Sequence, residues 1–98
     1  MKTNEKILEF TFTLFLVSSK VVPGLRMSAW QVDDSSYLMP SEITKVTLSN
    51  NHYYIKVICI DPNDKIKISD IKKKFFFGHP GKIFGEGVLE TVMPARSS

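Results

Sequence analysis

Six lysines lie between positions 65 and 82, and three phenylalanines are interleaved with them. The same interval holds a single acidic residue, Asp70. Ammonium groups attract a phosphate backbone, and an exposed aromatic ring can stack on a nucleotide base. The candidate nucleic-acid-binding residues are Lys72, Lys73, Lys74, Phe76, His79 and Lys82. Two other interpretations stay open. Lysines more commonly solvate a strand surface or protect an exposed edge against aggregation, and a basic surface can also bind an acidic protein.

The histidines, the cysteine and the serines show no spacing that is typical of a metal site or a catalytic centre. His52 and His79 both fall in predicted turns, and no C-x-x-C, H-x-x-x-H or H-E-x-x-H pattern occurs. There is no G-x-S-x-G nucleophile motif, and no G-x-x-x-x-G-K-[ST] phosphate-binding loop of the kind that GTP hydrolysis needs. We therefore expect no metal, no cofactor and no enzymatic activity.

Length and composition predict one small domain. The chain has 98 residues, of which 43% are hydrophobic, and a formal net charge of +3. A single modest core over residues 1–98 is expected, with residues 1–6 and 94–98 frayed. The mild positive charge permits a nucleic-acid partner without requiring one.

The cysteine and the N-terminal apolar segment bear on the compartment. Cys59 is the only cysteine and lies in an apolar run, so we expect a buried small hydrophobe in a reducing cytoplasm. The segment Phe10–Val17 is too short to span a bilayer and follows Glu5 and Glu9, which do not suit an export signal. A retained strand is expected there, with no membrane association.

The C-terminal third of the chain predicts two β-strands joined by a tight turn. Phe75–Phe77 and Ile83–Val92 are rich in aromatic and β-branched residues, which suit a half-buried pleated surface. The connecting Gly-His-Pro-Gly forms the turn, because glycine tolerates positive φ and proline fixes φ. Two further glycines share one face of the second strand, where glycine is unfavourable unless another backbone comes close or the strand bends sharply. They therefore predict a strongly coiled, barrel-like sheet. The structural glycines are Gly78 and Gly81 in the turn and Gly85 and Gly87 in the strand.

Short alternating segments separated by turn residues fill the rest of the chain. The predicted strands are Leu8–Val17, Arg26–Val32, Ile43–Leu48 and Tyr53–Ile60. The predicted turns and breaks are Pro23-Gly24, Asp33–Ser36, Met39–Glu42, Ser49–His52 and Asp61–Asp64. Lys65–Ser69 alternates only briefly. No segment has helical apolar periodicity over eleven or more positions, so little or no helix is expected, and the pattern indicates a β-barrel or a β-sandwich.

The C-terminal run K-K-F-F-F-G-H-P-G-K-I-F-G-E-G-V-L resembles the end of the C-terminal domain of elongation factor Tu, a six-stranded β-barrel. That family ends roughly L-R-F-A-I-R-E-G-G-R-T-V-G-A-G-V-V. The matching positions are Phe75, Gly81, Lys82 (an arginine in the family), Gly85, Gly87 and Val88. Upstream, Tyr54–Pro62 (Y-I-K-V-I-C-I-D-P) resembles the family's I-K-M-V-V-T-L-I-H-P, and Gly24-Leu25-Arg26 resembles its G-Y-R. The resemblance covers most of the chain in the same order.

Two departures from the family concern function. The family's G-G-R-H-T-P segment, which helps to shape its tRNA-facing surface, is replaced by Ser18–Pro23, and His79-Pro80 replaces an acidic-glycine pair before the final turn. The chain thus resembles the barrel alone, without the GTP-hydrolysing part that accompanies it in the family.

The expected fold class is an all-β, six-stranded, closed or nearly closed antiparallel barrel like the C-terminal domain of elongation factor Tu. The resemblance implies a non-enzymatic binding module that engages RNA (tRNA-like) through the basic strand–turn–strand of residues 72–82. A protein partner is a close second hypothesis, because free-standing barrels often act through their exposed strands. A small immunity-type or regulatory protein that blocks an enzyme is the third.

Overall fold

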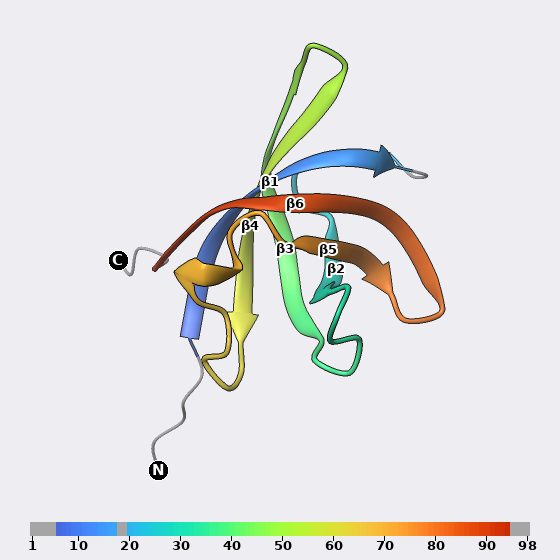
Figure 1. The fold of residues 1–98 in the computed structure, drawn as a ribbon. Coiled ribbons are helices and arrows are strands. Elements are labelled where there is room, and N and C mark those ends of the chain that lie inside the picture. The colour runs from blue at the N-terminus through green and yellow to red at the C-terminus, as the bar shows by residue number, and fades with distance from the viewer. Residues whose placement is uncertain (1–5, 18–19, 95–98) are drawn as a thin grey trace.

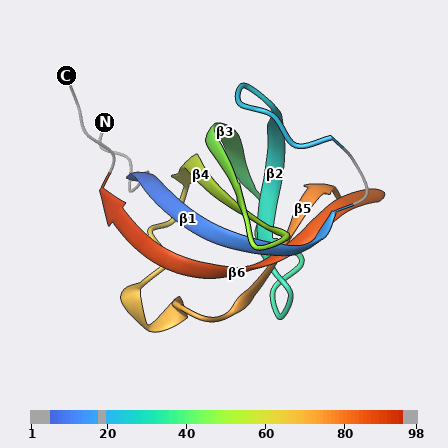
Figure 2. The same cartoon turned by 90° about the horizontal axis from the view of Figure 1, so that it is seen from above.

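A computed structural model describes residues 6–17 and 20–94 as a closed β-barrel (Figure 1). The strands are β1 (Lys6–Val17), β2 (Arg26–Gln31), β3 (Met39–Ser49), β4 (His52–Asp61), β5 (Lys74–His79) and β6 (Lys82–Pro94), and one turn of 3-10 helix, η1 (Ile68–Asp70), precedes β5. Their order around the sheet is β1-β4-β3-β2-β5-β6, every pairing is antiparallel, and β6 pairs with β1 again (Figure 2). The predicted all-β, six-stranded barrel is confirmed over the described residues, and it is closed.

Alternation along β1 shows why these residues form a barrel strand. Leu8, Phe10, Phe12 and Leu14 point inward and are buried, while the threonines and glutamate between them lie on the outer surface and are half-buried. Side chains two residues apart share a face of a strand, so a period of two places every second side chain in the core. Burying four large apolar side chains from one strand is a major stabilising contribution.

Four phenylalanine rings from β1 and β5 fill the centre of the barrel. The ring of Phe12 lies 4.7 Å from that of Phe77, 5.2 Å from Phe75 and 5.6 Å from Phe10, measured between centroids, and each pair meets edge to face. These arrangements place the positive edge of one ring against the negative face of the next. The interior is thus occupied by side chains, as a narrow barrel requires, and a partner can reach only the outer surface or the loops.

One of the two strand glycines is needed where β6 crosses β1. A Cβ atom on Gly87 would lie 2.6 Å from the carbonyl oxygen of Thr13 and 2.7 Å from Cδ2 of Leu14. The predicted close approach of another backbone is therefore real at Gly87. Gly85 is also buried on the same face of β6, and both glycines lie in the long bent strand that closes the barrel (Figure 2).

The two turn glycines differ from each other. Gly78 has a φ of +135°, and a Cβ there would lie 2.5 Å from the carbonyl oxygen of Lys82. Gly81 has no positive φ, and nothing lies within 4 Å of the position that its Cβ would occupy. Gly78, expected in the turn, instead belongs to β5, where its positive φ and the nearby bulge require glycine. Gly81 lies in the turn, as predicted, but without a positive φ.

Several element boundaries differ from those that the sequence indicated. Met39–Glu42, expected as a break, is the first part of β3, and Pro40 fits because β3 pairs only with β2 until its pairing with β4 begins at Ser41. Lys65–Ser69 forms no strand, because the chain there crosses from β4 to β5 as a loop that ends in η1. Of the ends expected to be frayed, Lys6 and Pro94 belong to β1 and β6, and residues 1–5 and 95–98 lie outside the described part of the chain.

Cys59 is a buried core residue, as expected. It is fully buried on the inner face of β4, and the hydroxyl of Ser41 donates a hydrogen bond of 3.2 Å to its Sγ atom. Burial raises the pKa of the Cys59 thiol to about 12. Since the thiolate is the nucleophile, Cys59 acts as a small apolar side chain rather than as a reactive group.

Candidate functional site

The predicted basic surface on β5 and the segment before it is largely neutralised by carboxylates. Lys72 pairs with Glu90, the Nζ atom of Lys73 lies 3.0 Å from Asp70, and that of Lys74 lies 3.7 Å from Glu86. The sequence interval from 65 to 82 conceals this balance, because two of the three acids belong to β6, the strand that pairs with β5. Such exposed pairs are weak and can exchange partners, but they leave the surface close to neutral.

The carboxylate of Glu90 has partners from two other segments of the chain. The hydroxyl of Thr13 donates a 2.7 Å hydrogen bond to the carboxylate of Glu90, which also pairs with Lys72. These two donors hold the pKa of Glu90 below its ordinary value. Three segments that are far apart in the sequence are therefore joined at this point, and Lys72 is a structural contact there.

Phe76 is only half-exposed and has a partner of its own. Its ring packs against the ring of Trp30 on β2, with 6.1 Å between centroids and a tilt of 58°. Trp30, although it faces outward, is only 3% exposed. Phe76 thus helps to cover Trp30, and stacking on a nucleotide base would compete with that contact.

His79 and Lys82 are the predicted site residues that remain accessible. They lie opposite each other at the ends of β5 and β6, both exposed, and no ion pair joins either of them to another of the described residues. The structure thus divides the predicted set. Four members have intramolecular partners, and two stand at a solvent-exposed turn.

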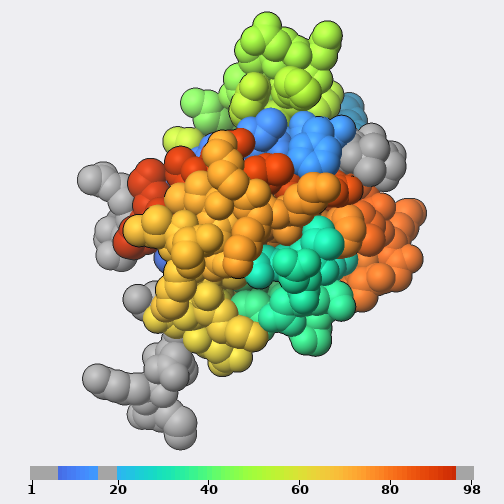
Figure 3. Space-filling view, in the orientation of Figure 1, coloured from blue at the N-terminus to red at the C-terminus, as the bar shows by residue number. Residues whose placement is uncertain are grey.

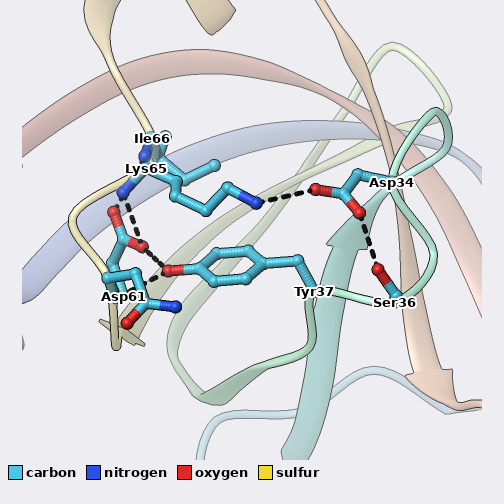
Figure 4. Close-up of polar contacts among 7 residues, drawn as sticks. Asp34, Ser36, Tyr37, Asp61, Lys65 and Ile66 are labelled. Atoms are coloured by element: carbon cyan, nitrogen blue, oxygen red, sulfur yellow. Dashed lines mark hydrogen bonds and ion pairs between the residues drawn. The ribbon is translucent and has the colours of Figure 1, made fainter.

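A carboxylate network that sequence reasoning missed lies at the end of β4 (Figure 4). Asp61 is fully buried at the end of β4 and accepts hydrogen bonds from the hydroxyl of Tyr37, from the backbone N–H of Lys65 at 3.1 Å and from that of Ile66 at 2.9 Å. The hydroxyl of Tyr37 in turn accepts a 2.9 Å hydrogen bond from the backbone N–H of Asn63. In the sequence Asp61 reads as an ordinary turn residue, because its partners come from two loops, one holding Tyr37 and the other Lys65 and Ile66.

Lys65 and Asp70 extend this network across the crossover loop. The Nζ atom of Lys65 lies 3.2 Å from Asp34 and 4.5 Å from the centre of the Tyr37 ring. Burial alone would raise the pKa of Asp70, but hydrogen bonds from the backbone of Lys67 and from the side chains of Lys73 and Gln31 hold it below the ordinary value. A hollow of only about 70 Å³ lies between these groups, so the network fastens the loop and does not enclose a substrate.

Tyr37 gives this network a measurable pH dependence. Burial and the bond to Asp61 raise the pKa of Tyr37 from 10.0 to about 12. The folded protein therefore binds the phenolic proton more tightly than the unfolded chain, and this stabilisation is complete below pH 10 and lost as pH rises from 10 to 12. The urea midpoint should fall more steeply over this interval in the unsubstituted protein than in a Tyr37→Phe variant. Parallel declines in the two proteins would contradict the assignment.

The hairpin formed by β3 and β4 is the most prominent projection of the barrel. Asn50 and Asn51 form its turn with φ values of 50° and 67°, as the sequence predicted. The tip stands clear of the body of the molecule in Figure 3, and Leu48 beside it is 62% exposed. A projecting hairpin is accessible from more directions than the strands of the barrel wall.

One edge of this hairpin is unpaired. The pairing of β2 with β3 ends at Glu42, and the last backbone contacts on that side are the 2.7 Å and 2.9 Å hydrogen bonds that join Ile43 to Gly24 and Leu25. Beyond Ile43, residues 44–49 have no backbone partner on that side among the described residues. Barrel closure therefore protects the first five residues of β3 but leaves the remaining six as an exposed edge.

Apart from the hairpin, an apolar groove lies between η1 and the end of β6. It has a volume of about 480 Å³ and includes Ile68, Val92 and Met93. Ile68 is 76% exposed and Met93 46%. Residues 90–94 of β6, beside this groove, likewise have no backbone partner on the side away from β1 among the described residues. They end in Pro94, which has no N–H to donate, whereas residues 44–49 contain no proline.

Residues 6–17 and 20–94 also bear on metal binding and on membrane insertion. No group of three or more histidine, cysteine, aspartate or glutamate side chains is arranged to hold a metal ion in that part of the chain. No helix within it is long and apolar enough to cross a membrane. No protein-family model, no curated protein and no solved structure matches this chain significantly.

Proposed function

We propose that the protein is a non-enzymatic interaction module that binds an extended segment of a partner protein along the free edge of β3. The observation that supports this proposal is the unpaired stretch of residues 44–49 on a projecting hairpin (Figure 3). An edge strand presents a row of N–H and C=O groups that an incoming strand can pair with, as in β-strand addition. Five of these six residues are exposed, and none is a proline.

Register identifies the backbone groups that an incoming strand would use. Ser49 and His52 flank the two-residue turn and form the first ladder pair of the hairpin. In an antiparallel ladder, alternate residues direct their backbone groups toward the partner strand and away from it. If Ser49, Thr47 and Lys45 face β4, then Val46 and Leu48 direct their N–H and C=O groups toward the open edge.

Leu48 allows a test that separates the backbone from the side chain. Leu48→Pro removes one N–H at the open edge, and Leu48→Thr is its matched control, because it keeps the N–H and a residue that favours strands. Ten-residue linear peptides selected from a random display library on the unsubstituted protein should bind Leu48→Pro at least about tenfold more weakly. Their binding to Leu48→Thr should change by less than about threefold.

Two readouts ensure that this result reports on the edge. Circular dichroism and the thermal midpoint establish that both variants keep the barrel. Amide chemical shifts recorded with and without peptide show which residues are contacted, and they should change most over residues 44–49. Selected peptides that bind Leu48→Pro as tightly as the unsubstituted protein, or that shift amides elsewhere, would overturn the proposal.

RNA binding is a second candidate function, supported by exposed His79 and Lys82 at the β5–β6 turn and by the resemblance to the C-terminal barrel of elongation factor Tu. Lys72, Lys73 and Lys74 would have to exchange their carboxylate partners for phosphates. A ten-nucleotide single-stranded RNA serves as a further arm of the binding experiment. RNA binding that a His79→Ala, Lys82→Glu double variant abolishes and Leu48→Pro leaves intact would favour this second candidate.

A further inference from the structure

Two lysines face each other on the outer surface of the hairpin. Lys45 on β3 and Lys56 on β4 are paired directly across the ladder, and both are exposed. Like charges at directly opposed positions of an antiparallel pair destabilise it. Such an arrangement therefore works against folding unless an anionic group lies between or above the two ammonium groups.

Lys45 and Lys56 differ in this respect from most basic residues of the barrel. Ion pairs join acidic side chains to Arg26, Lys65, Lys67, Lys72, Lys73 and Lys74. No ion pair joins Lys45 or Lys56 to a carboxylate within the part of the chain that the structure describes. Glu42, the acidic residue nearest to Lys45 along β3, pairs with Arg26 at 3.2 Å.

The surface around the two lysines is hollowed and carries hydroxyl groups. A depression of about 110 Å³ is lined by Thr11, Lys45, Thr47, Tyr54, Ile55 and Lys56. Threonine and tyrosine hydroxyls donate hydrogen bonds, and ammonium groups donate charge-assisted ones, so the lining suits a carboxylate. Of these residues, Lys45, Thr47, Tyr54 and Lys56 lie on the outer face of the hairpin that presents the free edge, and Thr11 lies opposite Lys56 on β1.

We infer that the strand received by the edge of β3 is acidic, with carboxylates at alternate positions that reach Lys45 and Lys56. This inference rests on the proposed function, and it specifies the chemistry of the partner. Alternate side chains of an added strand lie on one face of the sheet, so carboxylates two residues apart would all extend over the outer surface where the lysines are. The incoming strand then supplies the negative charge that the hairpin lacks.

A second copy of this chain is a poor occupant of the same edge. Its own exposed edge carries Lys45, so pairing two copies edge to edge would bring further lysines next to Lys45 and Lys56. Cross-strand repulsion would then increase instead of being relieved. Charge complementarity therefore favours an acidic segment of another protein.

Three capped ten-residue peptides test the inference. All share the same valine and threonine residues and carry glutamate, glutamine or lysine at alternate positions. The glutamate peptide should bind about tenfold more tightly than the glutamine peptide at low salt, and raising the salt concentration should remove most of this advantage. The lysine peptide should bind more weakly than either.

Charge reversal at the two lysines of the protein is the experiment that complements the peptide series. Lys45→Glu and Lys56→Glu should each weaken binding of the glutamate peptide, and the double variant should prefer the lysine peptide. Lys82→Glu is the matched control, because it makes the same charge change away from the hairpin. Lys56→Glu should also raise the thermal midpoint by about 3 °C, since an opposed like pair becomes an attractive one.

Failure of this inference can be distinguished from failure of the proposed function. If the glutamate and glutamine peptides bind equally well and both are weakened by Leu48→Pro, the edge binds strands but the acidic preference is refuted. The inference is refuted in the same way if neither binds while library-selected peptides do. If no peptide depends on Leu48, the proposed function itself fails. Binding of the ten-nucleotide RNA that Lys45→Glu and Lys56→Glu abolish, without peptide binding, would assign the lysines to nucleic acid.

Discussion

A Gly87→Ala substitution is expected to lower the free energy of unfolding by about 3 kcal/mol, near the upper end of the range for overpacking. The added methyl group would lie 2.6 Å from the carbonyl oxygen of Thr13, which is backbone of the neighbouring strand and cannot rotate away. Relief requires β6 to move away from β1, and these are the two strands that close the barrel. Urea denaturation followed by the fluorescence of Trp30, the only tryptophan, measures the change.

Gly81→Ala is the matched control for this prediction. It adds the same methyl group to another glycine of the same strand–turn–strand, but nothing lies within 4 Å of its Cβ position and its φ is not positive. The urea midpoint of Gly81→Ala should equal that of the unsubstituted protein or rise slightly, because alanine restricts the unfolded chain. Equal losses in the two variants would show that glycine matters here through flexibility, and would refute the contact between β6 and β1 as the cause.

The fold follows from local patterns wherever a strand alternates regularly. β1 and the β3–β4 turn are examples, because side-chain alternation and the two asparagines act within a few residues. The glycines of β6 were also informative, because glycine within a strand usually marks a bend or the close approach of another backbone. A period of two and the choice of turn residues therefore sufficed to predict an all-β fold.

The candidate site depends on register, which the sequence pattern does not specify. A register shift between Ile43 and Lys45 inserts an extra residue into β3. Strict alternation from the buried Ile43 would turn Lys45 inward, whereas the bulge turns it outward, opposite Lys56. The opposed lysines are therefore a product of one irregularity, and neither residue belonged to the basic cluster that the sequence indicated.

The net charge of the surface around Lys72, Lys73 and Lys74 also depends on pairing between strands. Lys72, Lys73 and Lys74 form a strongly basic run in the sequence, yet Glu86 and Glu90 on β6 lie against two of them. A count along the chain cannot include acids that lie across a ladder. The run of three lysines thus lies on a nearly neutral surface. Lys45 and Lys56, eleven residues apart in the sequence, lie opposite each other without a carboxylate partner among the described residues.

The crossover loop leads to the second large expected effect, at Asp61. An Asp61→Ala variant should lose about 3 kcal/mol of folding free energy, because the Tyr37 hydroxyl and the backbone N–H groups of Lys65 and Ile66 would lose their shared acceptor. Each buried donor left without a partner costs about 1–3 kcal/mol, and water entering the space left by the carboxylate would recover part of this. The urea midpoint measures the loss, and titration of the phenol should show the pKa of Tyr37 falling toward its ordinary value.

Asp34→Ala is the control that separates a buried acceptor from an exposed one in the same network. Asp34 contacts Lys65 and Ser36 at the surface, where water replaces the lost contacts, so its removal should leave the urea midpoint within experimental error. The difference between the two variants follows from where the donors are: those of Asp61 are largely backbone groups of the loop that cannot turn to solvent without unfastening it. If Asp61→Ala were as stable as Asp34→Ala, the loop between β4 and β5 would be held by its apolar contacts, with Ile66 as the principal anchor in the core.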